Sequence, residues 1–282
     1  MRPLDGIRVL DLSQMWAAPG SAMYLADQGA DVVKVEPFTG DDARYTMTLP
    51  PIRDGQSRAY LVVGRNKRGI ALDIRAPAGQ EVIHRLIPQF DVVTVNFRPG
   101  VAERLRVDYE TLRRLNRRLI YVHLTAYGWQ GPYADRPGYD VLIQALSGIF
   151  SRRRTAEGMP IASPIWAADC SAPMILAYGV ALALLMRERT GEGQLVESSL
   201  LMASLAMQSV DAIRVPDTRT DDGGDYSRQA MYSPYRCSDG SWLVIAVVQN
   251  RQWERLCSAL GLDHLSADTR FDTALKRARE SA

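Results

Sequence analysis

The chain contains few of the residues from which metal sites and disulfide scaffolds are built. Its 282 residues include three cysteines and three histidines. The cysteines, Cys170, Cys237 and Cys257, lack the CxxC spacing of zinc and redox sites, and the histidines form no cluster of metal-ligand type. We therefore expect no metal ion, and we expect reduced thiols, which are typical of a cytoplasmic protein.

A strong charge of one sign is also absent. The 34 basic and 32 acidic residues leave a formal net charge of +2, which gives no general case for binding nucleic acid or a membrane surface. The N-terminal stretch carries Arg2, Asp5 and Arg8 and no extended apolar core, so we expect no signal peptide there. The apolar run from Ala172 to Met186 is predicted to be too short to span a bilayer and to form a buried core helix.

The apolar residues, 46% of the chain, alternate between strand and helix patterns. Short apolar runs predict strands at Ile7–Leu12, Asp31–Val35, Ile70–Ile74, Asp91–Val95 and Leu119–Thr125. Segments of helical spacing lie between them, at Ala18–Gln28, Pro77–Ile87, Val101–Arg106 and Tyr109–Leu115. This alternation predicts an α/β fold with a doubly wound, Rossmann-like parallel sheet, in which ligands bind beyond the carboxyl ends of the strands.

A smaller α+β domain is predicted to begin after this sheet. Its first elements are a strand at Trp242–Val248 and a helix at Arg251–Leu260, with Asn250 as the helix cap. We place the large domain at residues 1–215 and the beginning of the small domain at residues 216–282.

The first turn from strand to helix lacks the glycines of a dinucleotide site. GxGxxG is absent, and the helix is entered through Ala17, Ala18, Pro19 and Gly20. Pro19 fits a first helical turn, and the turn is compatible both with a bound phosphate or carboxylate and with no ligand at all. Glu36, at the end of the second strand, could hold a ribose, but without the glycines we do not expect NAD.

Asp169 is the first candidate for a catalytic residue. It is the only charged residue between Glu157 and Arg187, and it precedes the apolar run that begins at Ala172. Its carboxylate loses solvation when that run folds inward, so it needs hydrogen bonds, a distant partner or a chemical role. A nucleophile and a helix N-cap are both compatible with the position, the latter with Pro173 in the first helical turn.

Basic residues gather around two of the predicted strands. They are Arg65, Lys67, Arg68, Arg75, Arg98 and Arg104. If they lie on neighbouring strand ends, several of these cations would converge and suit a phosphorylated ligand. The alternative is a solvated rim of basic residues paired with local acids.

Seven blocks of sequence occur in a fixed order along the chain. They are PLDGIRVLDLS at residues 3–13, GADVVKVEP at 29–37, NKRGIALD at 66–73, NFRPG at 96–100, YG with GPY at 127–133, RPGYD at 136–140 and RTGEGQ at 189–194. Together they resemble the class III CoA-transferases, the family of formyl-CoA and carnitine CoA-transferases. The resemblance covers nearly the whole chain, from Pro3 to about Leu260.

The resemblance implies that Asp169 is the nucleophile. The implied reaction moves CoA from an acyl-CoA thioester to a free carboxylic acid, through an acyl-aspartyl anhydride and an aspartyl-CoA thioester. CoA and acyl-CoA are then substrates, and no tightly bound cofactor is expected. We also expect the N-terminus of the following helix to stabilise the Asp169 carboxylate and the charge that develops on attack.

The resemblance also implies a set of CoA contacts. They are Ala17, Leu72, Asp73, Ile74, Arg75, Asn96, Phe97, Arg98, Arg104, Arg136, Pro137, Gly138 and Tyr139. The α-methylacyl-CoA racemases of the same superfamily carry a histidine at the position of Tyr139. Since an unperturbed tyrosine titrates at about 10, transfer is favoured over racemisation, which stays the second hypothesis.

Assembly is also implied by the family. Its members form interlocked homodimers, place a mobile glycine loop near the position of Gly223–Gly224, and continue well past the position of Ala282. We therefore expect an incomplete small domain, uncovered apolar surface, and either a homodimer or a partner chain that supplies the remainder. A third hypothesis is a non-catalytic chain that binds CoA or serves as a subunit.

Overall fold

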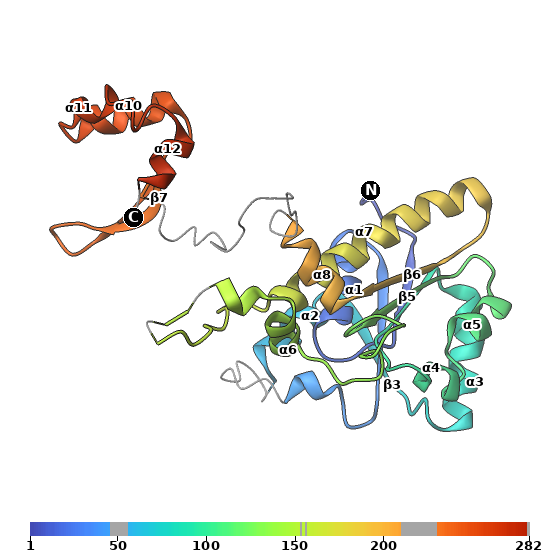
Figure 1. Cartoon of the computed structure of the whole chain (residues 1–282). Coiled ribbons are helices and arrows are strands. Elements are labelled where there is room, and N and C mark those ends of the chain that lie inside the picture. Colours follow the sequence, from blue (N-terminus) through green and yellow to red (C-terminus); the bar gives the residue numbers. More distant parts are fainter. Residues whose placement is uncertain (46–55, 153, 156, 210–229, 281–282) are drawn as a thin grey trace. The chain divides into compact units, whose positions relative to one another are not determined.

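The computed structural model describes residues 1–45, 56–152, 154–155, 157–209 and 230–280 (Figure 1). The chain divides into two compact units, Met1–Ile213 and Arg214–Ala282. The predicted domain boundary at residue 215 lies outside the described residues.

The first unit is built on a six-stranded parallel sheet with the order β3-β2-β1-β4-β5-β6. The strands are β1 (Arg8–Asp11), β2 (Asp31–Glu36), β3 (Lys67–Ala71), β4 (Val92–Val95), β5 (Ile120–Thr125) and β6 (Leu195–Ser199). The strand order reverses between β1 and β4, which makes the loops after these two strands the topological switch point. The predicted doubly wound α/β fold is confirmed.

Helices cover both faces of this sheet (Figure 1). They are α1 (Ala17–Asp27), α2 (Arg58–Gly64), α3 (Pro77–Leu86), α4 (Val101–Arg104), α5 (Tyr109–Leu115), α6 (Asp140–Leu146), α7 (Ala167–Thr190) and α8 (Leu200–Ala206), with short 3-10 helices at Asp42–Arg44, Ile87–Gln89 and Ile149–Arg152. Successive strand residues point to opposite faces, so Val9 packs in the core with α1 and α7, and Leu10 packs in the core with α3 and α5.

The two edge strands depart from the sequence prediction. The strand expected at Ile70–Ile74 is β3 at Lys67–Ala71, and β6 was not predicted at all. Both are edge strands with mostly exposed or half-exposed residues, so no continuous apolar run marks them. As a result, Leu72–Arg75 lie in the loop beyond the carboxyl end of β3.

Helix α7 is longer than the apolar run predicted. It has 24 residues, and by length and composition it could cross a membrane, so the prediction that it is too short is wrong. One stripe of the helix, which includes Ala172, Leu176 and Val180, is fully buried in the core with α1 and the sheet. The expected core helix is therefore confirmed for that stripe.

In the second unit, the described residues 230–280 form a hairpin and three helices. The elements are β7 (Tyr232–Arg236), β8 (Trp242–Ala246), α10 (Asn250–Ala259), α11 (Asp263–Ser266) and α12 (Ala274–Arg279). Helix α10 is capped by Gln249, whose side chain forms a capping box with Gln252. Asn250 is therefore the first helical residue and not the predicted cap.

Candidate active site

Asp169 lies in the first turn of α7, but it does not cap the helix. The helix begins at Ala167, and the cap position is occupied by Trp166, which makes no side-chain cap hydrogen bond. The alternative in which Asp169 serves as the N-cap is therefore wrong. Pro173 lies inside the helix and not in its first turn, because the helix begins earlier than the apolar run.

The missing cap is supplied by Asp140, the first residue of α6. Its Oδ1 accepts hydrogen bonds from the backbone N–H of Ala168 at 2.8 Å and of Asp169 at 3.1 Å. The Gln144 side chain donates to the other oxygen of Asp140 and to the carbonyl of Ile165 at 3.0 Å. A buried carboxylate thus joins the N-termini of α6 and α7 and fixes the turn that carries Asp169.

The surroundings of Asp169 favour its neutral form. Burial, and then the nearby negative charge of Asp140, raise the pKa of Asp169 to about 7. The pKa therefore shifts in the direction opposite to the one expected from the helix N-terminus alone. A carboxyl group with this pKa ionises near neutral pH and is a stronger nucleophile than an ordinary aspartate.

A cleft of about 440 Å³ lies at the switch-point edge of the sheet. It is lined by Leu12, Gln14, Val35, Glu36, Pro37, Thr39, Gly40, Asp42, Leu72, Asp73, Ile74, Arg75, Phe97, Val101 and Leu105. Five of the predicted CoA contacts, those at residues 72–75 and Phe97, are thus brought together by the loops after β3 and β4. The other predicted contacts are not among the residues that line this cleft.

The side chain of Asn96 is hydrogen-bonded to the backbone of Gln14. Its Oδ1 accepts from the backbone N–H of Gln14 at 2.9 Å, and its Nδ2 donates to the carbonyl of Gln14 at 2.7 Å. The two bonds tie the loop after β1 to the loop after β4, across the switch point. Asn96 therefore shapes the edge of the cleft by holding Gln14, which lines it.

Most of the basic residues are paired with local acids. Arg65 binds Asp27, Arg68 binds Asp31, Arg75 binds Asp73, and Lys67 is buried against Asp11. Because β3 begins at Lys67, the residues Arg65, Lys67 and Arg68 lie at the amino end of that strand and do not converge on the cleft.

Arg98 and Arg104 are the exceptions. Among the described residues, their side chains have no hydrogen-bond or ion-pair partner. They flank Val101 in the sequence, and Val101 lines the cleft, although neither arginine is among the lining residues.

The remaining predicted contacts are Ala17 and the segment from Arg136 to Tyr139. Ala17 is the buried first residue of α1. The Arg136 guanidinium stacks on the Tyr133 ring at 4.2 Å, and Pro137 accepts a hydrogen bond from Tyr127 at 3.3 Å. A Cβ on Gly138 would lie 2.3 Å from the Cβ of Ala126, so this position requires glycine. Tyr139 is exposed and precedes the cap residue Asp140.

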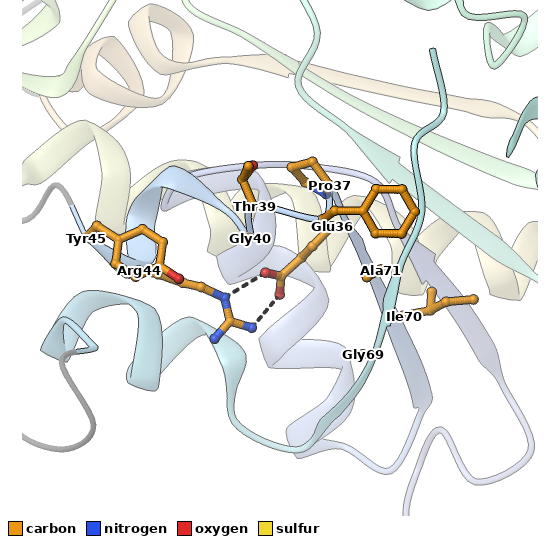
Figure 2. A pocket seen from close by; sticks show the side chains of 10 residues that line it. Glu36, Pro37, Thr39, Gly40, Arg44, Tyr45, Gly69, Ile70 and Ala71 are labelled. Atoms are coloured by element: carbon orange, nitrogen blue, oxygen red, sulfur yellow. Dashed lines mark hydrogen bonds and ion pairs between the residues drawn. The ribbon is translucent and has the colours of Figure 1, made fainter. Parts of the chain in front are cut away.

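A second pocket, of about 400 Å³, adjoins the cleft at the edge strand β3 (Figure 2). Figure 2 shows the guanidinium of Arg44 facing the carboxylate of Glu36, with bonds of 2.7 and 3.0 Å. Glu36 also accepts from the Tyr60 hydroxyl at 2.6 Å and from the backbone of Asp41 at 2.9 Å. Its oxygens are therefore engaged by the protein and are not available to a ribose.

Sequence reasoning missed Asp140 and Gln144 as site residues. The sequence shows an aspartate before the apolar start of α6, which indicates a cap. It does not show that the carboxylate caps a different helix, 28 residues further along the chain. The glycine loop predicted at Gly223–Gly224 lies outside the described residues.

Comparisons with known proteins give one result. The family model described as CoA-transferase family III matches residues 4–282. The succinate–glutarate CoA-transferase of Agrobacterium fabrum is 36% identical over 96% of this chain and 70% of its own length. The succinyl-CoA–D-citramalate CoA-transferase of Chloroflexus aurantiacus is 34% identical over 100% of this chain and 70% of its own length.

A comparison with solved structures gives a similar result. The crystal structure of a hypothetical protein from Mycobacterium tuberculosis has a TM-score of 0.86 and 32% identity, and the match covers 99% of this chain and 74% of that one.

Proposed function

Because the chain belongs to CoA-transferase family III, we propose that Asp169 is the nucleophile through which it transfers CoA. The chain is an enzyme that moves CoA between acyl-CoA thioesters and carboxylic acids. The proposal about Asp169 is supported by one observation above all. Its half-buried carboxyl group lies in the first turn of a helix, near the negative charge of Asp140, with its pKa raised to about 7.

The proposed reaction begins with two exchanges at Asp169. A carboxylate oxygen attacks the thioester carbonyl, the carbon–sulfur bond breaks, and CoA thiolate leaves an acyl-aspartyl anhydride. The thiolate then attacks the aspartyl carbonyl of this anhydride and releases the donor carboxylate. An aspartyl-CoA thioester remains, and no proton or electron is gained or lost.

The acceptor acid completes the cycle by the same two steps in reverse. Its carboxylate attacks the aspartyl thioester, which gives a new mixed anhydride and free thiolate. The thiolate attacks the acceptor carbonyl, and the new acyl-CoA leaves with Asp169 restored as a carboxylate. Each step exchanges one activated acyl group for another, which keeps the barriers low.

We propose that CoA lies along the switch-point cleft. The loop at residues 72–75 and Phe97 would contact its nucleotide, and Arg98 and Arg104 would bind its phosphates. Ala17 and the Arg136–Tyr139 segment would then contact the part of the ligand nearer to the thioester. This placement uses two cations of the predicted set, Arg98 and Arg104, whose side chains have no hydrogen-bond or ion-pair partner among the described residues.

We further propose a cytoplasmic homodimer. Exposed apolar side chains on α6, α7 and α8 support association with another chain. They are Val141, Leu142, Leu146, Met174, Tyr178, Leu182, Leu185, Met186, Met202 and Leu205. Light scattering coupled to size-exclusion chromatography tests the homodimer, and a monomer at micromolar concentration would contradict it.

The decisive experiment compares the wild type with Asp169→Ala and Asp169→Asn. Succinyl-CoA or glutaryl-CoA is supplied with a panel of carboxylic acids, and intact-protein mass spectrometry follows a CoA adduct on the chain. We expect both variants to lose transfer and adduct. Equal transfer by all three proteins would remove Asp169 from the mechanism.

Two further outcomes identify the other hypotheses. Solvent deuterium that enters the α-carbon of an acyl-CoA without an acceptor acid would indicate a racemase. Binding of CoA without turnover of any thioester would indicate a non-catalytic subunit.

A further inference from the structure

The turn between β1 and α1 has an unusual backbone. Met15 has a φ of 69°, in the left-handed region that is unfavourable for a residue with a long side chain. The turn leads into Trp16, which occupies the cap position of α1 without making a side-chain cap hydrogen bond. A strained conformation of this kind persists only where the surrounding structure holds it.

Side chains from three other elements hold this turn. Lys34 on β2 donates to the carbonyl of Ser13 at 2.7 Å, and Asn96 makes both hydrogen bonds to the backbone of Gln14. Asp41 accepts from the N–H of Met15 at 3.1 Å and forms an ion pair with Lys34 at 2.9 Å. The backbone of three successive residues is therefore fixed from outside the turn.

A buried ion pair also connects this turn to the first turn of α1. Lys67 binds Asp11 at 2.8 Å and donates to the carbonyl of Pro19, in the first turn of α1, at 2.7 Å. Asp11 in turn accepts from the N–H of Ser13 at 3.1 Å and from the Thr94 hydroxyl at 2.8 Å. The side chains of Asp11 and Lys67 are almost inaccessible to solvent, so the arrangement is rigid.

The start of α1 contacts α7 on both sides of Asp169. The ring of Trp16 meets the ring of Trp166 edge to face, with centroids 5.2 Å apart. Gly20 faces the ring of Pro173 so closely that an added Cβ would lie 2.9 Å from its Cγ. Trp166 precedes Asp169 by three residues and Pro173 follows it by four, so the two contacts bracket the carboxylate.

We propose that the Ser13–Trp16 turn, together with Gly20, positions Asp169 by holding the first two turns of α7 at these two contacts. The inference rests on the proposed role of Asp169 as nucleophile. Trp16 and Gly20 are positioning residues in this account, since they act on the carboxylate through α7.

The test compares lesions near Asp169 with a matched lesion far from it. Trp16→Ala removes one contact, and Gly20→Ala forces α1 and α7 apart at the other. Gly179→Ala is the control. Gly179 lies on the same helix as Asp169 but ten residues beyond it, and an added Cβ there would lie 2.8 Å from the side chain of Val196. All three substitutions disturb packing, but only the first two disturb the turn that carries the carboxylate.

The first experiment measures two quantities, the rate at which acyl-CoA forms the adduct on Asp169 and the equilibrium affinity for CoA. We expect Trp16→Ala and Gly20→Ala to slow the adduct at least about tenfold, since a small misplacement of a reacting group is costly. CoA binding should change less than about threefold, and Trp16→Phe, which keeps an aromatic edge, should restore most of the rate. Gly179→Ala should match the wild type.

The second measurement does not depend on activity. The carboxyl carbon of Asp169 is titrated by NMR, with Asp169→Asn for assignment. Trp16→Ala should lower the pKa of Asp169 from about 7, because water reaches a group whose pKa is raised mainly by burial. Gly179→Ala should leave it unchanged.

The outcomes separate the two proposals. A wild type that forms no adduct contradicts the proposed nucleophile, and the titration alone then decides the inference. If both Trp16→Ala and Gly20→Ala match Gly179→Ala in adduct rate and in titration, the positioning role is overturned.

Discussion

Asp140 accepts a hydrogen bond from the backbone N–H of Asp169 at 3.1 Å and, by its charge, raises the pKa of the Asp169 side chain. One carboxylate therefore builds the helix turn that presents another and also makes that second carboxyl group harder to ionise. The two effects are coupled because the backbone N–H and the side chain of Asp169 both lie close to the carboxylate of Asp140.

This coupling predicts that structure and charge can be separated at Asp140. Asp140→Asn keeps an oxygen that accepts from the helix amides but removes the negative charge. The pKa of Asp169 should fall, so the acid limb of the kcat/KM profile should move below the value of about 7 expected for the wild type. Asp140→Ala should in addition lose about 1–2 kcal/mol of folding stability with the cap.

A pH profile of kcat/KM from pH 5 to 9 and urea unfolding measure these two effects. An acid limb that stays in place in Asp140→Asn would show that the charge of Asp140 does not act on Asp169.

His123 should make stability depend on pH. Burial lowers its pKa to about 4, from 6.5 in the unfolded chain, so the unfolded chain binds more protons between these values. Stability from this residue is complete above pH 6.5 and falls as the pH decreases toward 4, by roughly 3 kcal/mol in all. Asp169 has the opposite slope over much of this range, since its pKa is raised.

The effect of His123 is therefore measured in the Asp169→Asn background, by urea unfolding at several pH values. Adding His123→Phe should abolish the fall in stability between pH 6.5 and 4, and adding His264→Gln, at an exposed position, should not. An unchanged slope after His123→Phe would assign the fall to other groups.

Lys67 and Arg68 are neighbours on β3 with opposite burial. Lys67→Met would leave the buried carboxylate of Asp11 without its ion pair and should cost about 3–5 kcal/mol. Arg68→Met removes an exposed pair with Asp31 and should cost less than about 1 kcal/mol. Chemical unfolding of both variants under the same conditions checks the contrast, and equal losses would contradict a rigid network beneath the turn.

Arg98 and Arg104 should contribute to CoA binding without affecting the chemistry. Arg98→Ala and Arg104→Ala should each raise the KM for acyl-CoA by about tenfold or more, as for a charged hydrogen bond, with kcat nearly unchanged. Arg68→Ala is the control, because that guanidinium is paired with Asp31. Steady-state kinetics with acyl-CoA and with the same thioester of a CoA analogue that lacks the 3′-phosphate would show which arginine binds which phosphate.

The sequence determined the features that depend on local order. Short apolar runs placed the buried strands β1, β2, β4 and β5, because a strand covered on both faces is mostly apolar. The isolation of Asp169 before a long apolar run marked it as a carboxylate in need of a role. The ordered blocks of sequence identified the family.

The tertiary structure decided the relations that join distant parts of the chain. Asp140 caps a helix that begins far along the chain, and Lys67 meets an aspartate 56 residues away. Edge strands were misplaced or missed because they bury too little apolar surface to leave a pattern. Periodicity reports which face of an element is buried, whereas the order of strands in the sheet decides which side chains meet. The surroundings of Asp169, which set its pKa and its position, therefore follow from the fold and not from the residues beside it in the sequence.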